Sequence, residues 1–401
     1  MLRSLRRASV SRGFFIVTII LGVFLGCDAN SVINQRLAQD CINGNCLAFK
    51  TWGQNIDAYI NKQAIGYSYI IMNHGLLADS NSFGQARTAA DSPQTTMTAD
   101  LPSNIASVNK TITAVAVLKL LAAKQVSVTS SIAPYLPKSW TLGVGVSGIT
   151  FAQLMTHTSG IRDTLNPDTS YANLQATMAQ NILPANKVYK YQNANFGLFR
   201  IIIPYLNGFN DAGVADIASA TDQLYQDYMH SVYSTDFPIT CKPHTGNPPQ
   251  VLSYATGATN GTDWGDWTDL CGAGGLQLTV NQMGVFLAHL MLGTYLPLTS
   301  PATPQANTTT LADMVSNGYG WDYTWPNTHG KCIAKNGDLG GGTPFVPSLS
   351  TLLVYCPDTG MGFVGLANST LPARPTHSYG FTGALDDIVY DAYNASWKPQ
   401  Q

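Results

Sequence analysis

Segments typical of β-strands lie near the two ends of this chain, and their separation restricts the possible folds more than any other feature. Near the start, residues 66–72 are rich in β-formers, and Asn73-His74-Gly75 predicts a hairpin turn after them. Near the end, residues 349–355 and 361–366 predict two more strands joined by a short turn. Helix and loop signals fill residues 150–290. Because strands need partners, the pattern predicts one sheet assembled from both ends of the chain around a helical middle.

Apolar residues at helical spacing predict three helices. The first has an apolar face made by Trp52, Ile56, Tyr59 and Ile60. The second spans residues 111–124, with Val115, Leu118, Leu121 and Ala122 in one stripe. The closing helix carries Leu385, Ile388, Val389, Ala392, Tyr393 and Trp397. Strands and helices together predict an α/β fold of the α+β type.

Charge is scarce in this chain, and its acidic residues are all aspartate. Charged residues make up 11% of the sequence and hydrophobic residues 45%, so uncharged polar side chains must keep the surface wet. These proportions exclude a disordered chain, a coiled coil and a nucleic-acid binder with a basic face. The absence of glutamate excludes H-E-x-x-H metalloproteases, and no C-x-x-C spacing suggests zinc. We expect no metal, no cofactor and no nucleic-acid partner, and a monomer that acts on a small molecule, peptide or ester.

The N-terminal segment is typical of an export signal. Residues 1–12 contain four arginines and no acid, and an apolar run follows from Phe14 to Leu25. At about 1.5 Å per residue this run reaches roughly 18 Å, too short for the ~30 Å hydrocarbon core of a bilayer. Its end, Phe24-Leu25-Gly26-Cys27, resembles the lipobox of bacterial lipoproteins, whose cysteine is acylated. We expect a signal peptide over residues 1–26 and a lipid on Cys27 that holds the protein at the periplasmic face of a membrane. The alternatives are ordinary cleavage to a periplasmic or secreted form, and an uncleaved anchor.

Six cysteines follow the signal segment, and an even number in an exported chain indicates disulfides. Cys41 and Cys46 bracket the turn sequence Ile-Asn-Gly-Asn. Cys332 and Cys356 lie equally far from a Gly/Pro-rich turn, so two antiparallel strands would place them opposite each other. The third pair, Cys241–Cys271, follows by elimination.

Ser107-Val-Asn-Lys110 lies at the start of the second predicted helix and combines a nucleophile with a base. The i, i+3 spacing places the hydroxyl and the amine on one face of the helix. A free serine hydroxyl is a poor nucleophile, and a neighbouring amine can take its proton. The alternative is an N-cap serine followed by an exposed lysine. The motif alone is weak, because a chain of this composition contains about one by chance.

Four further segments follow this motif in order. They are residues 149–160 (ITFAQLMTHTSG), Tyr191-Gln-Asn193, residues 272–276 (GAGGL) and Lys335-Asn336-Gly337. In this order and spacing the set resembles the serine β-lactamase and penicillin-recognising enzyme family, in its branch of class C β-lactamases, D,D-peptidases and related esterases. The resemblance covers about residues 50–400.

The family fold implied by this resemblance is an antiparallel sheet flanked by helices, beside a mainly helical domain. We expect a linker over residues 27–50 and one hydrolase unit over residues 51–401. Within that unit, the α/β part would take about residues 51–104 and 320–401, and the helical part about residues 105–319.

The resemblance also implies roles for individual residues. Ser107 matches the acylated nucleophile and Lys110 its activating partner. Tyr191 matches a proton shuttle, and two nearby ammonium groups would favour its phenolate and lower its pKa from about 10. Lys335 matches the lysine on the strand beside the site. Asn193 matches the amide that holds the acyl side of the substrate.

The strand that would bind the substrate departs from the family pattern. The resemblance places substrate against Asn336, Gly337 and Asp338, with the backbone N–H groups of Ser107 and Asp338 as the oxyanion hole. Asn336 stands where the family has a threonine that helps to bind the substrate carboxylate, and Asp338 where serine is usual. A carboxylate about 4 Å from a substrate anion would cost roughly 4 kcal/mol at an effective dielectric near 20. Arg374 is the nearby cation that can offset this cost. The departures therefore favour esters or less anionic amides.

Two other features have plainer explanations. His157 lies in the His-Thr-Ser-Gly segment, which is structural in the family, so it receives no catalytic role. Residues 263–269 (DWGDWTD) are able to bind a cation or stack on a sugar, but a surface loop is the simpler interpretation. We expect an acyl-enzyme at Ser107, formed from a β-lactam, a D-Ala peptide or an ester. A non-catalytic envelope protein that keeps the fold for binding is the alternative.

Overall fold

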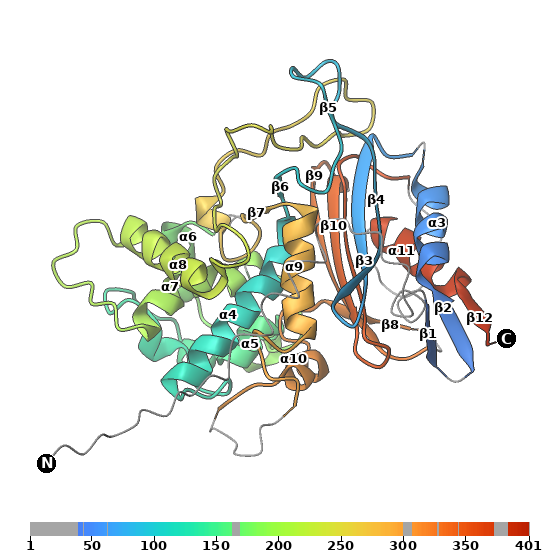
Figure 1. The fold of residues 1–401 in the computed structure, drawn as a ribbon. Helices are drawn as coiled ribbons and strands as arrows, with labels where there is room; N and C mark the ends of the chain where they lie inside the picture. Colours follow the sequence, from blue (N-terminus) through green and yellow to red (C-terminus); the bar gives the residue numbers. More distant parts are fainter. Residues whose placement is uncertain are drawn as a thin grey trace, which may run out of the picture.

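The computed structural model describes residues 39–42, 44–61, 63–162, 169–299, 307–326, 329–343, 345–372 and 384–400. The expected signal peptide, the lipidation candidate Cys27 and the candidate cation Arg374 lie outside these residues. An antiparallel sheet with helices on both faces lies beside a larger group of helices (Figure 1). The predicted α/β fold is confirmed.

The main sheet joins the two ends of the chain, and within the described residues it has seven strands. In spatial order they are β5 (Thr95–Thr96), β4 (Leu76–Arg87), β3 (Gly66–Asn73), β11 (Met361–Ala367), β10 (Val346–Cys356), β9 (Cys332–Gly341) and β8 (Tyr323–Trp325), each antiparallel to its neighbours. β3 and β11 come from opposite ends of the sequence, and Ile70 lies opposite Val364. His74 and Gly75 have φ of 49° and 78°, as a tight hairpin turn requires. The sheet assembled from both ends is therefore confirmed.

Helices cover both faces of this sheet. On one face, α3 (Phe49–Ile60) packs against α11 (Ala384–Ala395). Trp52 is fully buried there, with ring centroids 5.8 Å from Phe363 and 5.3 Å from Tyr393. On the other face lies α9 (Val280–Met291), which separates the sheet from the helical part (Figure 1). The apolar stripes predicted for the first and closing helices are the faces that these helices bury.

The helical part surrounds α4 (Asn109–Lys124), which is buried on almost every side. Its other helices are α5 (Phe151–Met155), α6 (Tyr171–Met178), α7 (Asn193–Leu206), α8 (Ile217–Tyr233) and α10 (Leu311–Asn317). Short 3₁₀ turns are η1 (Ala106–Val108), η2 (Ala133–Tyr135), η3 (Val146–Gly148), η4 (Pro184–Asn186) and η5 (Thr268–Leu270), and a small strand pair joins β6 (Ser103–Asn104) to β7 (Gln277–Leu278). Ala106–Lys124 has the length and apolar composition of a membrane span, but its burial among these elements is that of a core helix.

The expected linker over residues 27–50 is contradicted from Gln39 onward. β1 (Gln39–Ile42) and β2 (Asn45–Ala48) form a hairpin, and α3 begins at Phe49. β12 (Trp397–Pro399) pairs with β2, so Trp397 belongs to a strand and not to the closing helix. Strands of three or four residues are too short to show alternation in sequence. Leu47 gives the physical reason for order here, because its side chain is fully buried in the same hydrophobic cluster as Trp52 and Tyr393.

Three disulfides are formed, and they are the three expected pairs. They join Cys41 to Cys46, Cys241 to Cys271 and Cys332 to Cys356. The last pair links the first residue of β9 to the final residue of β10, as the turn argument required. The Cys241–Cys271 disulfide links the chain after α8 to residues 271–275. This segment runs beside α4, where the Gly272 carbonyl accepts a hydrogen bond from Thr113 Oγ1 at 3.0 Å.

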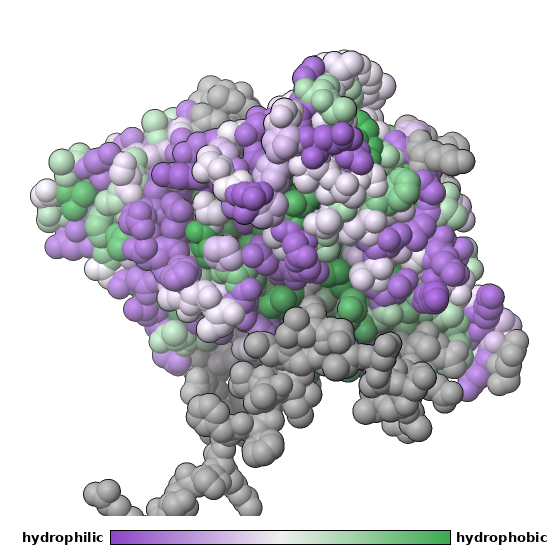
Figure 2. Space-filling view, turned by 45° about the horizontal axis from the view of Figure 1, so that its top comes forward, coloured by the Kyte–Doolittle hydropathy of each residue, from purple (hydrophilic) through white to green (hydrophobic). Residues whose placement is uncertain are grey.

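The surface is polar without being strongly charged. Hydrophilic residues and small apolar areas are interspersed over the face shown in Figure 2.

Candidate active site

Ser107 lies in a 3₁₀ turn that leads directly into α4. Asn104 Oδ1 accepts a hydrogen bond at 2.7 Å from the N–H of Ala106, the residue before the serine. Ala106 has φ of +47°, a left-handed conformation that costs a residue with a Cβ roughly 1 kcal/mol. Ala106 and Val108 are fully buried, so packing maintains this conformation and presents Ser107 at the start of the helix.

Lys110 lies one turn further along and is fully buried. Its Nζ donates to Ser107 Oγ at 3.0 Å and to Asn193 Oδ1 at 2.9 Å, and it also donates to the carbonyl of Ala273. Asn193 is the first residue of α7. The structure therefore excludes an exposed lysine and places the amine of the S-x-x-K motif against the hydroxyl.

Tyr191 reaches Ser107 from the segment before α7, with its hydroxyl 2.6 Å from Ser107 Oγ. The ring of His157 packs against the Tyr191 ring, with centroids 4.5 Å apart and an interplanar angle of 32°. His157 Nδ1 accepts hydrogen bonds from the Gln192 N–H at 3.3 Å and from Asn195 Nδ2 at 3.0 Å. Burial and the nearby Lys110 hold the pKa of His157 well below its usual range, so this imidazole is neutral. His157 thus positions the tyrosine segment, consistent with the structural role expected for it.

Lys335 brings a second amine to the site from β9. Its side chain is 1% exposed, and its Nζ lies 2.5 Å from Asp322 Oδ2. It also lies 5.5 Å from the centroid of the Tyr191 ring, and Lys110 Nζ lies 5.0 Å from the same centroid. Four predicted residues from three separate segments therefore meet in one place. Asp322, just before β8, is a fifth member that the sequence did not indicate.

The electrostatics of the site differ from the expected phenolate. Burial, followed by the charge of Lys335, holds the pKa of Lys110 well below its ordinary value, so this amine is able to be neutral and accept a proton. Burial and the Asp322 carboxylate raise the pKa of Tyr191 well above 10, so the phenol keeps its proton. The predicted phenolate is wrong for two reasons. Burial disfavours the charged form of the phenol, and the Asp322 carboxylate repels a phenolate.

β9 passes so close to Ser107 that only glycine fits at position 337. A Cβ on Gly337 would lie 2.7 Å from the backbone nitrogen of Ser107 and 2.5 Å from Thr351 Oγ1. The nucleophile turn and the expected substrate-binding strand therefore form one continuous wall. The resemblance assigns the oxyanion hole to this wall, at the N–H groups of Ser107 and Asp338.

The two departures from the family pattern contact each other. Asn336 Nδ2 donates to Asp338 Oδ2 at 2.9 Å, and Ser350 Oγ donates to Asp338 Oδ1 at 2.6 Å. Asn336 and Asp338 both line the cleft, so the Asp338 carboxylate faces the region where substrate would lie. Burial raises the pKa of Asp338 to about 6, which leaves it ionised above that pH.

Two cavities open beside Ser107, and Ser107, Asn193 and Asp338 line both. The tryptophan lobe, about 380 Å³, is named for Trp267 and is also lined by Ala106, Thr169, Asp266, Asp269, Leu270, Ala273, Gly274 and Leu339. The tyrosine lobe, about 610 Å³, is also lined by Tyr189, Tyr191, Asp322, Tyr323, Asn336 and Phe345. The nucleophile therefore lies between two spaces, each large enough for one side of a substrate.

The loop over residues 263–269 forms a wall of the tryptophan lobe, so its interpretation as a plain surface loop is incomplete. Trp264 Nε1 donates to Ser253 Oγ at 2.8 Å, and Trp267 Nε1 donates to the Trp264 carbonyl. These bonds fix both indoles. Two tryptophans in a Gly/Asp loop were the sequence signal for this wall. Tyr189, Tyr323 and Phe345 carried no signal, because single aromatic residues are usually core.

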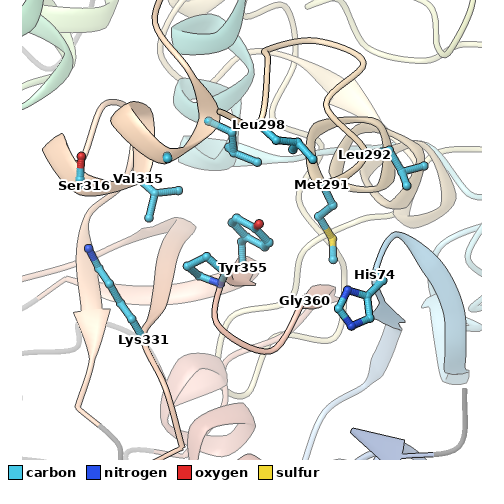
Figure 3. Close-up of a pocket in the computed structure, with 12 residues that line it drawn as sticks. His74, Met291, Leu292, Leu298, Val315, Ser316, Lys331, Tyr355 and Gly360 are labelled. Atoms are coloured by element: carbon cyan, nitrogen blue, oxygen red, sulfur yellow. The ribbon is translucent and has the colours of Figure 1, made fainter. Parts of the chain in front are cut away.

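A separate cavity of about 550 Å³ lies at the opposite end of the sheet, beside the two hairpin turns (Figure 3). His74, Met291, Lys331 and Tyr355 are among its lining residues. None of the described residues predicted for the site lines it. Within the described part of the chain, no three His, Cys or Asp side chains gather as a metal site.

The fold and the site together define the class of β-lactamase/transpeptidase-like proteins. An antiparallel sheet with helices on both faces holds a serine, two buried lysines and a tyrosine at its junction with the helical part. The Beta-lactamase family model matches residues 52–380, so the chain belongs to this family.

Solved structures show the same fold at low sequence identity. A β-lactamase/D-alanine carboxypeptidase from Yersinia pestis is 16% identical with a TM-score of 0.60, over 91% of this chain and 99% of that one. A class C β-lactamase from Rhodobacter sphaeroides is 16% identical with a TM-score of 0.60, over 85% and 97%. A penicillin-binding protein homologue from Pyrococcus abyssi is 15% identical with a TM-score of 0.53, over 80% and 73%. No curated protein matches the sequence.

Proposed function

We propose that the protein is a serine hydrolase that forms an acyl-enzyme at Ser107. The observation that carries this proposal is the network around one hydroxyl. Ser107 Oγ lies 3.0 Å from an amine with a depressed pKa and 2.6 Å from a phenol that keeps its proton. Acyl transfer needs a base to activate the nucleophile and an acid to protonate the leaving group, and both are in reach here.

The reaction would proceed in two halves. Lys110 takes the proton of Ser107 as its Oγ bonds to the substrate carbonyl carbon, and the backbone N–H groups of Ser107 and Asp338 stabilise the oxyanion. Collapse breaks the bond to the leaving group, which departs with the proton of Tyr191, and the proton on Lys110 restores the phenol. Water then attacks the carbonyl carbon of the acyl-enzyme, with the same groups transferring the protons, and the acid is released from Ser107 Oγ.

The substrate is an ester, an amide or a β-lactam. Similarity to a β-lactamase/D-alanine carboxypeptidase and to a class C β-lactamase supports the last two. Asn336 and Asp338 favour esters or less anionic amides, because the Asn336 amide is engaged by the Asp338 carboxylate. A carboxylate at that position repels the carboxylate that a β-lactam or D-Ala terminus carries.

Covalent labelling tests this function. The protein is incubated with a fluorophosphonate and with a fluorescent penicillin, and the labelled residue is identified by mass spectrometry. We expect the fluorophosphonate to label Ser107 and the penicillin to label it far more slowly. Ser107→Ala should abolish labelling with little change in melting temperature, whereas Ser231→Ala, at an exposed serine on α8, should leave labelling intact.

The outcomes separate the alternatives. Label from neither reagent on folded protein would overturn the hydrolase and favour a non-catalytic envelope protein. Penicillin hydrolysis as fast as that of a dedicated β-lactamase would refute the preference for esters. Label on a serine other than Ser107 would refute the assigned nucleophile.

We also propose that the protein is exported and held at a membrane through a lipid on Cys27. The basic and apolar residues before Cys27 support export, and the three disulfides agree with an oxidising compartment. Mass spectrometry of the mature N-terminus tests this directly. A diacylated Cys27 is expected, and an unmodified N-terminus at another residue would contradict it.

A further inference from the structure

Tyr191 decides which lobe holds the leaving group, given the proposed function. The departing atom must receive a proton from a group within hydrogen-bond reach. The Tyr191 hydroxyl is 2.6 Å from Ser107 Oγ, and Tyr191 lines the tyrosine lobe but not the tryptophan lobe. The leaving group therefore lies in the tyrosine lobe, and the acyl group in the tryptophan lobe.

The charge facing the tyrosine lobe is negative. Among the described residues that line it, the charged side chains are the carboxylates Asp322 and Asp338. Asp322 is neutralised by Lys335, whose side chain is 1% exposed and does not line the lobe. Asp338 is held by the uncharged donors Asn336 and Ser350, which fix the carboxylate without cancelling its charge.

The other side chains around this lobe are mostly aromatic, and several are exposed. Phe345 is 56% exposed and Tyr189 57%, and Tyr323 completes the set. Exposed aromatic residues that gather around one cavity mark a binding surface. The faces of aromatic rings attract cations, and a carboxylate beside them adds a full opposite charge.

We infer that the leaving group of the natural substrate carries a positive charge, as an alkylammonium alcohol or amine bound between the Asp338 carboxylate and the aromatic rings of the tyrosine lobe. For an ester, Ser107 Oγ bonds to the carbonyl carbon and the bond from that carbon to the alcohol oxygen breaks. The alcohol departs with the proton of Tyr191 and keeps its ammonium charge. Water then converts the acyl-enzyme to the free acid.

A matched pair of esters isolates the charge. Acetylcholine and 3,3-dimethylbutyl acetate share an acyl group and a shape, and differ in that a quaternary nitrogen replaces a carbon. Their hydrolysis is followed by pH-stat at pH 8 and low salt, where Asp338, with a pKa of about 6, is ionised. We expect kcat/KM to be about tenfold higher for acetylcholine.

Variants connect the preference to the lobe. Asp338→Asn should lower the ratio of the two kcat/KM values by about three- to tenfold. Asp227→Asn removes the same charge from an exposed position on α8 outside the cleft, and should leave the ratio unchanged. Because each ratio is internal to one protein, partial loss of fold does not affect it. Thermal denaturation checks that each variant is folded.

A second readout removes dependence on turnover. Choline and 3,3-dimethylbutan-1-ol are compared for their ability to slow fluorophosphonate labelling of Ser107, and choline should protect at lower concentration. The cationic leaving group would be overturned if choline and 3,3-dimethylbutan-1-ol protected equally and the two esters had equal kcat/KM, or if the neutral compounds were preferred. Labelling of Ser107 in the same experiment would still support the hydrolase. Absence of labelling would instead overturn the proposed function.

Discussion

Lys110 shows how burial changes the chemistry of an ordinary side chain. In water a lysine is protonated at neutral pH, but here its amine is enclosed and lies near the charge of Lys335. Asn193 Oδ1 and the Ala273 carbonyl accept hydrogen bonds from it, and Ser107 Oγ lies 3.0 Å from its Nζ. A neutral amine keeps a lone pair that can take the serine proton. The depressed pKa lets this amine accept a proton, and the raised pKa of Tyr191 keeps the phenol protonated. In the proposed reaction the two groups would divide the proton transfers between them.

The pH dependence of acylation follows from this division. A base with a lowered pKa becomes neutral at lower pH, so labelling of Ser107 should rise with pH and level off well below pH 10.5. Lys110→Arg keeps a positive charge at every accessible pH, and should slow labelling by roughly 10²- to 10⁴-fold. The measurement is the fluorophosphonate labelling rate between pH 5 and pH 10. Lys124→Arg, at the exposed end of α4, is the control. A wild-type rate independent of pH, or full activity in Lys110→Arg, would contradict this assignment.

At the scale of elements, the site depends on the close approach of β9 to η1 and α4. Neither element holds the site alone, since β9 carries Lys335 and Asp338 while η1 and α4 carry Ser107 and Lys110. Thr351 Oγ1 on β10 donates to the Ile105 carbonyl at 2.8 Å and links the sheet to the turn. Glycine at position 337 sets how closely β9 approaches the turn that carries Ser107.

Two glycines of β9 provide a matched test of this approach. Gly337→Ala places a Cβ 2.7 Å from the Ser107 nitrogen, so it should lower the free energy of unfolding by about 1–3 kcal/mol and greatly slow Ser107 labelling. Gly341→Ala meets no atom within 4 Å and should change neither. Urea denaturation and the labelling rate measure the two effects. Normal labelling in a stable Gly337→Ala protein would show that β9 and the Ser107 turn are less closely packed than described.

At the scale of the whole molecule, the two ends of the chain build the sheet, and the middle builds the helical part against it. The site lies at their junction, so its geometry depends on long-range packing. Cys241–Cys271 acts at this level, because it holds residues 271–275 beside α4, and the Ala273 carbonyl there accepts from Lys110.

Loss of this disulfide should therefore affect both stability and activity. A crosslink over a separation of 30 residues is worth about 3.6 kcal/mol through the lower entropy of the unfolded chain. Replacing both Cys241 and Cys271 by serine should lower the melting temperature by several degrees and slow Ser107 labelling. Replacing Cys41 and Cys46, which close a six-residue hairpin far from the site, should leave labelling unchanged. Equal labelling in both double variants would remove any role of Cys241–Cys271 in holding Ala273 against Lys110.

The sequence by itself determined the features that depend on local pattern. Periodicity located the main helices and strands, turn residues located the β3–β4 hairpin, and the order of short motifs identified Ser107, Lys110, Tyr191 and Lys335. It failed where elements were very short, as in β1, β2 and β12, because four residues carry no measurable period.

Only the tertiary structure decided the electrostatics and the shape of the cleft. Asp322 neutralises Lys335, the Asp338 carboxylate faces the substrate region, and Tyr191 is a protonated phenol. Each of these facts depends on the distance between charges and on their burial, for residues up to about two hundred positions apart. Coulomb energy and desolvation are set by those distances in space, and a one-dimensional pattern does not contain them.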